Sequence, residues 1–224
     1  RISVALREEN LYNYLEQNNP TLQSMIFRPV KGEQEGNIGL DFDEAFALRN
    51  DADPLRRFIH RRLSSRPLIE RLHVADNILA KVQLFHESSI SHNDLDIKNI
   101  WVDNSTNVFF SGFIQSYYPE VKGKNFSDIS LIDYRSGCVD EEGPQFDQTK
   151  DVYALGLMLR ALFADLFDSA NEGVKTDVGQ SILKIVEKIE SERYESVIAL
   201  RQDLGKILHS EETQPLLSVD DFAK

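Results

Sequence analysis

The amino-acid sequence predicts an α+β fold that is mainly helical in its C-terminal part. After residue 67, apolar residues recur three or four positions apart over long stretches, which is the period of a helix with one buried face. Strand-like runs are short and are bounded by polar turns. The chain has no internal repeat and no low-complexity segment. We therefore expect one domain with a small sheet and a large helical part.

The N-terminal elements are read from periodicity and from their end signals. Residues 8–17 are expected to form a helix that ends in the Asn-Asn-Pro of positions 18–20. Two strand-like runs follow at 25–27 and 38–42. The Asp53-Pro54 pair predicts the start of another helix, because Asp is a favoured N-cap and Pro fits the first turn.

Five further elements follow. Pro67 begins a long helix whose apolar residues form one core-facing side. A short strand is expected at 108–110, and helices are expected at 148–167, 176–190 and 196–209. The core-facing residues of the helix after Pro67 are Leu68, Leu72, Ala75, Leu79 and Val82.

Composition favours a soluble, cytoplasmic protein. The 224 residues are 41% hydrophobic, enough for one large domain or for a lobe with a smaller appendage. No apolar run reaches the roughly 18 to 20 residues of a membrane span, and no signal peptide opens the chain. Cys138 is the only cysteine, so no internal disulfide is possible and a reducing or an indifferent compartment is expected.

The net charge of −12 argues against binding to nucleic acid or to an anionic membrane, because both would be repelled. One local exception is a group of arginines in the helices after residue 53. A solvated helix face is the favoured interpretation, and recognition of a phosphate or an acidic partner is the alternative. These residues are Arg56, Arg57, Arg61, Arg62, Arg66 and Arg71.

Residues 90–102 read I-S-H-N-D-L-D-I-K-N-I-W-V, in which His92, Asp94 and Asn99 have the spacing H-x-D-x-x-x-x-N. This string resembles the catalytic loop of protein kinases. The resemblance implies that Asp94 is the base that accepts the proton of the substrate hydroxyl. It implies that Asn99 binds a metal ion beside the nucleotide, and that His92 is structural. The alternative is a buried His with a turn-forming Asp.

Two further stretches resemble the same family. Asp151–Leu157 reads D-V-Y-A-L-G-L, like the start of the central helix of a kinase C-lobe, and the resemblance implies that Asp151 braces the catalytic loop. Residues 192–196 resemble the approach to the final helices of bacterial-type Ser/Thr kinases, and imply an ion pair between Arg193 and Asp140 or Glu141.

The chain is thereby identified as a member of the protein-kinase-like superfamily, with a mainly helical C-lobe and a reduced N-lobe. The resemblance divides it into an N-lobe remnant and hinge at 1–50, a C-lobe at 51–209 and a polar tail at 210–224.

The groups that bind nucleotide depart from the family pattern. No G-x-G-x-x-G loop occurs, and Val4–Arg7 has only a faint likeness to the V-A-I-K strand. Gly112-Phe113-Ile114 stands where D-F-G is expected, thirteen residues after Asn99, so Gly112 offers no carboxylate to a metal. Mg²⁺ usually requires one or two carboxylates besides phosphate oxygens.

The loop itself has also lost positive charge. Asn93 replaces the usual Arg, and Asp96 replaces the usual phosphate-contacting Lys. A carboxylate about 4 Å from a phosphate charge costs roughly 4 kcal/mol at an effective dielectric constant near 20. We therefore expect a pseudokinase without ATP or metal. It would act as a scaffold or an allosteric regulator, and its protein partner would be an active kinase or another domain of the same chain.

A competing interpretation uses Asp133. Ser130–Arg135 reads S-L-I-D-Y-R and resembles the metal-binding I-D-W or I-D-F of aminoglycoside phosphotransferases and choline kinases. Asp94 would then be the base, and Asn99 with Asp133 would hold Mg²⁺ beside ATP. Residues 111–129 would be an insertion, and the chain would be an active atypical kinase or small-molecule phosphotransferase.

Overall fold

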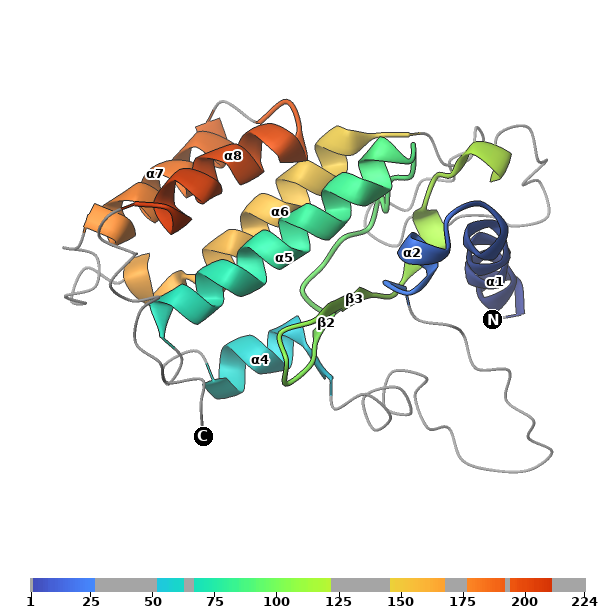
Figure 1. The fold of residues 1–224 in the computed structure, drawn as a ribbon, viewed down its shortest axis with the longest axis horizontal. Coiled ribbons are helices and arrows are strands. Elements are labelled where there is room, and N and C mark those ends of the chain that lie inside the picture. The colour runs from blue at the N-terminus through green and yellow to red at the C-terminus, as the bar shows by residue number, and fades with distance from the viewer. Residues whose placement is uncertain are drawn as a thin grey trace.

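A computed structural model gives the arrangement of the chain as mixed α and β, mostly helical, with one small antiparallel sheet (Figure 1). None of its described helices combines the length and the apolar composition that crossing a membrane requires. The structure describes residues 2–26, 52–62, 67–121, 146–167, 177–191 and 194–210.

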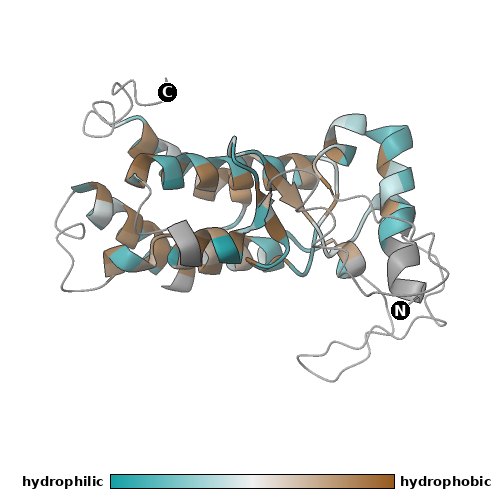
Figure 2. Ribbon diagram, turned by 90° about the horizontal axis from the view of Figure 1, so that it is seen from below, coloured by the Kyte–Doolittle hydropathy of each residue, from teal (hydrophilic) through white to brown (hydrophobic). Residues whose placement is uncertain are grey.

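Four helices form the larger part: α5 (Leu68–Glu87), α6 (Gln148–Leu162), α7 (Asp177–Ser191) and α8 (Val197–Leu208). Helix α5 packs against α6 and α8, and α7 packs against both α6 and α8. The apolar residues of these helices gather where the helices face one another (Figure 2). All four were predicted from the sequence, and each prediction is confirmed to within a few residues at either end.

The predicted core-facing side of α5 is also confirmed, with a small shift at its start. Leu72, Ala75, Leu79 and Val82 are at most 2% exposed, while Leu68 is half-buried. After α6, the 3-10 turn η4 (Ala164–Phe167) completes the helical stretch that was predicted to continue to residue 167.

The sheet has the strand order β1 (Asp53–Pro54), β2 (Ile100–Val102) and β3 (Val108–Phe110), with both pairs antiparallel. The prediction that Asp53-Pro54 starts a helix is wrong by two residues. Both residues pair with β2, and helix α4 (Leu55–Arg62) begins only after them. The expected strand at 108–110 is confirmed.

The N-terminal helix α1 (Ile2–Asn18) is longer than the predicted 8–17, and α2 (Pro20–Gln23) follows it. Val4–Arg7 lies within α1, which corrects its comparison with a nucleotide-binding strand. Helix α1 packs against η2 (Phe113–Gln115), a 3-10 turn that begins directly after Gly112. A second turn, η3 (Pro119–Val121), follows. The expected strand at 38–42 lies outside the described residues.

Candidate functional site

The loop from Ile90 to Asn99 joins the end of α5 to β2. Its first part is fixed by a two-way backbone pairing, in which the Ser91 amide donates to Tyr117 (3.1 Å) and the Tyr117 amide donates to Ser91 (2.9 Å). Tyr117 follows η2, so this pairing ties the loop to the segment after Gly112. The candidate site therefore lies where α5, β2 and η2 meet.

Asp151, in the first turn of α6, holds the loop by its backbone. Its carboxylate is 1% exposed and accepts hydrogen bonds from the amides of His92 and Asn93, both at 2.8 Å. The Nε2 of His86 lies 2.9 Å from the same carboxylate and donates a third bond. These contacts place Asp151 where a brace for the loop was expected. The part of His86 was not expected, since its position in the sequence only marks the end of a helix.

Asn93 adopts the left-handed backbone conformation, with φ of 62°. Asn tolerates this conformation better than most residues with a side chain. Its Nδ2 donates to the Gln115 carbonyl in η2 at 3.0 Å. The Asn that stands in place of Arg therefore fits the turn and joins it to η2, a role that sequence spacing did not reveal.

His92 is buried, and this burial lowers the pKa of its imidazole. The carboxylates of Asp151 and Asp94 and the bond to Ser111 oppose that shift in part. The geometry fits a neutral ring: Nε2 donates to the Ser111 carbonyl at 2.8 Å, and Nδ1 accepts from the Asp94 amide at 3.3 Å. The centroid of the Phe113 ring lies 4.4 Å from the centroid of the imidazole. His92 is thus a structural residue, packed and hydrogen bonded on both nitrogens.

Asp94 and Asn99 come together as the spacing suggested. The side-chain Nδ2 of Asn99 donates to the backbone carbonyl of Asp94 at 2.9 Å. The backbone amide of Asn99 donates to the backbone carbonyl of Asp96, also at 2.9 Å. Asn99 is therefore held by the loop, and the Asp94 side chain is half-buried beside it.

Gly112 occupies the position of the expected metal carboxylate in a conformation that suits glycine. Its φ is +76°, and a Cβ placed on it would lie 2.8 Å from the Cγ and the Nδ2 of Asn99. The neighbouring Ser111 hydroxyl accepts from the Trp101 indole at 3.0 Å. In the described ranges, no three His, Cys, Asp or Glu side chains are grouped so that they could hold a metal ion.

The charge of Asp96 is compensated to a degree that the sequence did not suggest. Its carboxylate accepts from the Lys98 amide at 3.0 Å, and the Lys98 ammonium lies 3.9 Å away. Both side chains are substantially exposed, so the ion pair is weak. The repulsion expected between Asp96 and a phosphate is reduced but not removed.

Asp133 and Arg193 lie outside the described residues, as do Asp140 and Glu141. The alternative metal ligand and the ion pair of Arg193 therefore stay predictions. In comparisons with known proteins, no family model matches the chain and no curated protein matches it.

Proposed function

We propose that this chain is a kinase-like domain with absent or strongly impaired phosphoryl transfer, which acts by binding a protein. The observation that carries the proposal is the pairing of Gly112 with Asn99. A residue with a carboxylate at position 112 would need both a strained backbone and the displacement of the Asn99 amide. Asn99 is packed so close to Gly112 that this arrangement favours a residue without a side chain at position 112.

The rest of the loop is compatible with this proposal, because the hydrogen bonds that brace it are made between protein groups. Asp151 binds backbone amides, and His92 is hydrogen bonded to Ser111. A loop held in this way keeps its shape after the catalytic groups are lost. The partner would be an active kinase or another domain of the same chain.

The surface of α6 offers apolar area for such a partner. Tyr153 and Leu157 are one helical turn apart and are 50% and 48% exposed.

The test is thermal unfolding with millimolar ATP, with and without Mg²⁺. A ligand that binds only the folded state raises the midpoint, by an amount equivalent to about 2.7 kcal/mol at one hundred times its dissociation constant. We expect no metal-dependent rise. We also expect no transfer of phosphate to protein or small-molecule acceptors above the level of the Asp94→Ala variant.

Two results would contradict the proposal. Phosphoryl transfer that disappears in Asp94→Ala would make the chain an enzyme. A Mg²⁺-dependent rise that disappears in Asp133→Asn would identify Asp133 as the missing ligand and favour the phosphotransferase alternative.

A further inference from the structure

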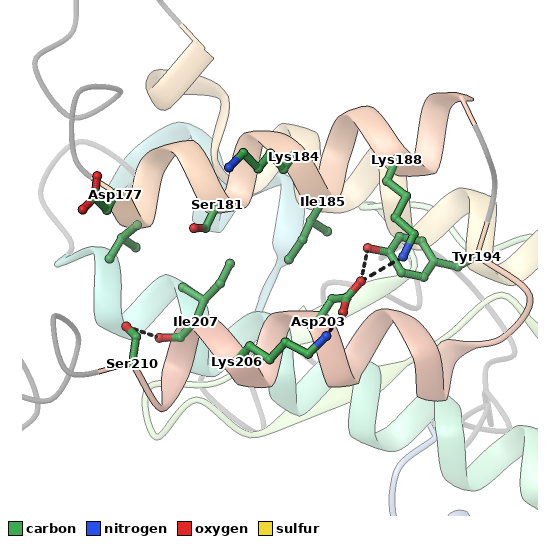
Figure 3. Close-up of a pocket in the computed structure, with 11 residues that line it drawn as sticks. Asp177, Ser181, Lys184, Ile185, Lys188, Tyr194, Asp203, Lys206, Ile207 and Ser210 are labelled. Atoms are coloured by element: carbon green, nitrogen blue, oxygen red, sulfur yellow. Dashed lines mark hydrogen bonds and ion pairs between the residues drawn. The ribbon is translucent and has the colours of Figure 1, made fainter.

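A surface groove of about 300 Å³ lies between α7 and α8 (Figure 3). Its apolar lining includes Val178, Ile185 and Ile207, which are only 6–7% exposed. Three lysines also belong to its lining. These lysines are Lys184, Lys188 and Lys206.

The groove carries a small positive charge on an acidic chain. Asp203 accepts from Lys188 at 3.1 Å, from Lys206 at 2.5 Å and from the Tyr194 hydroxyl at 2.9 Å. These three donors hold the pKa of the Asp203 carboxyl at about 2. Lys184 is exposed and forms no ion pair with any other residue that the structure describes. With Asp177 included, the lining has three lysines and two aspartates, while the whole chain has a net charge of −12.

The last fourteen residues of the sequence, 211–224, have the complementary composition. They read E-E-T-Q-P-L-L-S-V-D-D-F-A-K, with four acidic residues and one lysine. Apolar residues lie between the acidic pairs and directly after the second pair: Leu216, Leu217, Val219 and Phe222. The segment begins next to Ser210, which itself lines the groove.

The segment is long enough to reach every part of the groove. Fourteen residues span up to about 46 Å when extended. Helix α7, with fifteen residues, is about 22 Å long. A covalently attached segment also has an effective concentration in the millimolar range, so that even a weak affinity gives substantial occupancy.

We propose that residues 211–224 dock in the groove between α7 and α8, with apolar side chains on its floor and acidic side chains against its lysines. This docking is independent of the proposed function, because α7 and α8 lie away from the candidate site.

The test uses the full chain with Cys138→Ser and a spin label on Ser218→Cys. We expect loss of amide NMR signal intensity in α7 and α8 around Ser181, Lys184 and Lys206, and full intensity in α1, which packs against η2 and does not line the groove. The Lys184→Glu and Lys206→Glu double variant should restore the lost signals, because it reverses two charges at the groove.

The matched control is Lys98→Glu with Lys150→Glu, which changes the net charge equally at exposed lysines outside the groove. It should leave the signal loss in α7 and α8 unchanged. Signal loss that is absent from α7 and α8 overturns the proposal and leaves the groove to another occupant. Loss that is the same in both double variants overturns it as well.

Discussion

Asp151 holds the candidate loop through two backbone amides and one imidazole, so the contact does not depend on the side chain at position 93. What position 93 requires is a residue that tolerates a positive φ, and Asn meets that requirement. This division explains how the shape of the loop can persist while its charged groups change. The shape is set by hydrogen bonds to the backbone, whereas the chemistry would be set by side chains.

The Asp151→Asn variant tests the brace. An amide in place of the carboxylate would turn an N–H towards one of three donors, which leaves a buried donor without an acceptor. We expect a loss of about 2–4 kcal/mol in the free energy of unfolding, measured by urea denaturation. The control is Asp177→Asn, an exposed position in the first turn of α7, which should cost less than about 1 kcal/mol. Equal effects of the two variants would contradict the bracing role.

Gly112 and Gly205 form a matched pair of glycines. Alanine at Gly112 meets a positive φ and a 2.8 Å approach to Asn99, so we expect a loss of about 1–3 kcal/mol of stability. Alanine at Gly205, within α8, meets nothing within 4 Å and should stabilise by about 0.5–1 kcal/mol. Denaturation midpoints of the two variants measure the difference. A stabilising effect at Gly112 would mean that the backbone there is not left-handed and that the site is not closed around Asn99.

At the scale of elements, helices were predicted well because their signal is local. The spacing of apolar residues in α5, α7 and α8 can be read from neighbouring residues of the sequence. The misassigned element, Asp53-Pro54, depends on a partner strand almost fifty residues away, and no local rule reveals that pairing. In the candidate site, the sequence spacing correctly predicted that Asp94 and Asn99 lie next to each other. The roles of His86, Asn93 and Lys98 depend on backbone geometry, which spacing does not contain.

Packing between α6 and α7 depends on Gly156. A Cβ at this position would overlap the Cγ2 of Ile189, which is 3% exposed. We expect Gly156→Ala to cost about 1–3 kcal/mol, because backbone and a β-branched side chain have little freedom to move. In an Ile189→Ala background the same change should be neutral or slightly stabilising, since the space is then open and Ala favours the helix. A double-mutant cycle by urea denaturation measures the coupling. Additive effects of the two substitutions would show that the helices do not touch there.

At the scale of the whole molecule, the proposed loss of metal and nucleotide binding would leave the domain to obtain its stability from its own core. The core runs without interruption from Leu11 in α1 through Phe110 in β3 to Leu204 in α8. Phe113 belongs to this core, and the buried His92 imidazole packs against its ring, with the two ring centroids 4.4 Å apart. The loop is therefore part of the core rather than an attachment to it. The protonation state of the loop should therefore affect the free energy of global unfolding.

Stability should fall as the pH decreases below about 7 because of His92. Burial lowers the pKa of His92 in the folded state, so the unfolded chain binds the proton first as the pH falls below about 6.5. The His92→Gln variant, which can still donate to Ser111, should lose much of this slope in urea denaturation. Asp203 acts in a separate window: its pKa of about 2 means that its contribution is present above about pH 4 and is lost between pH 4 and 2. Asp203→Asn should therefore lower stability above about pH 4 and remove this part of the decline between pH 4 and 2. If His92→Gln unfolds, an NMR titration of the His92 ring in the unmodified chain serves instead, with a pKa below 6.5 expected. An unchanged slope in the variant, or a ring that titrates above 6.5, would show that His92 is not buried as a neutral group.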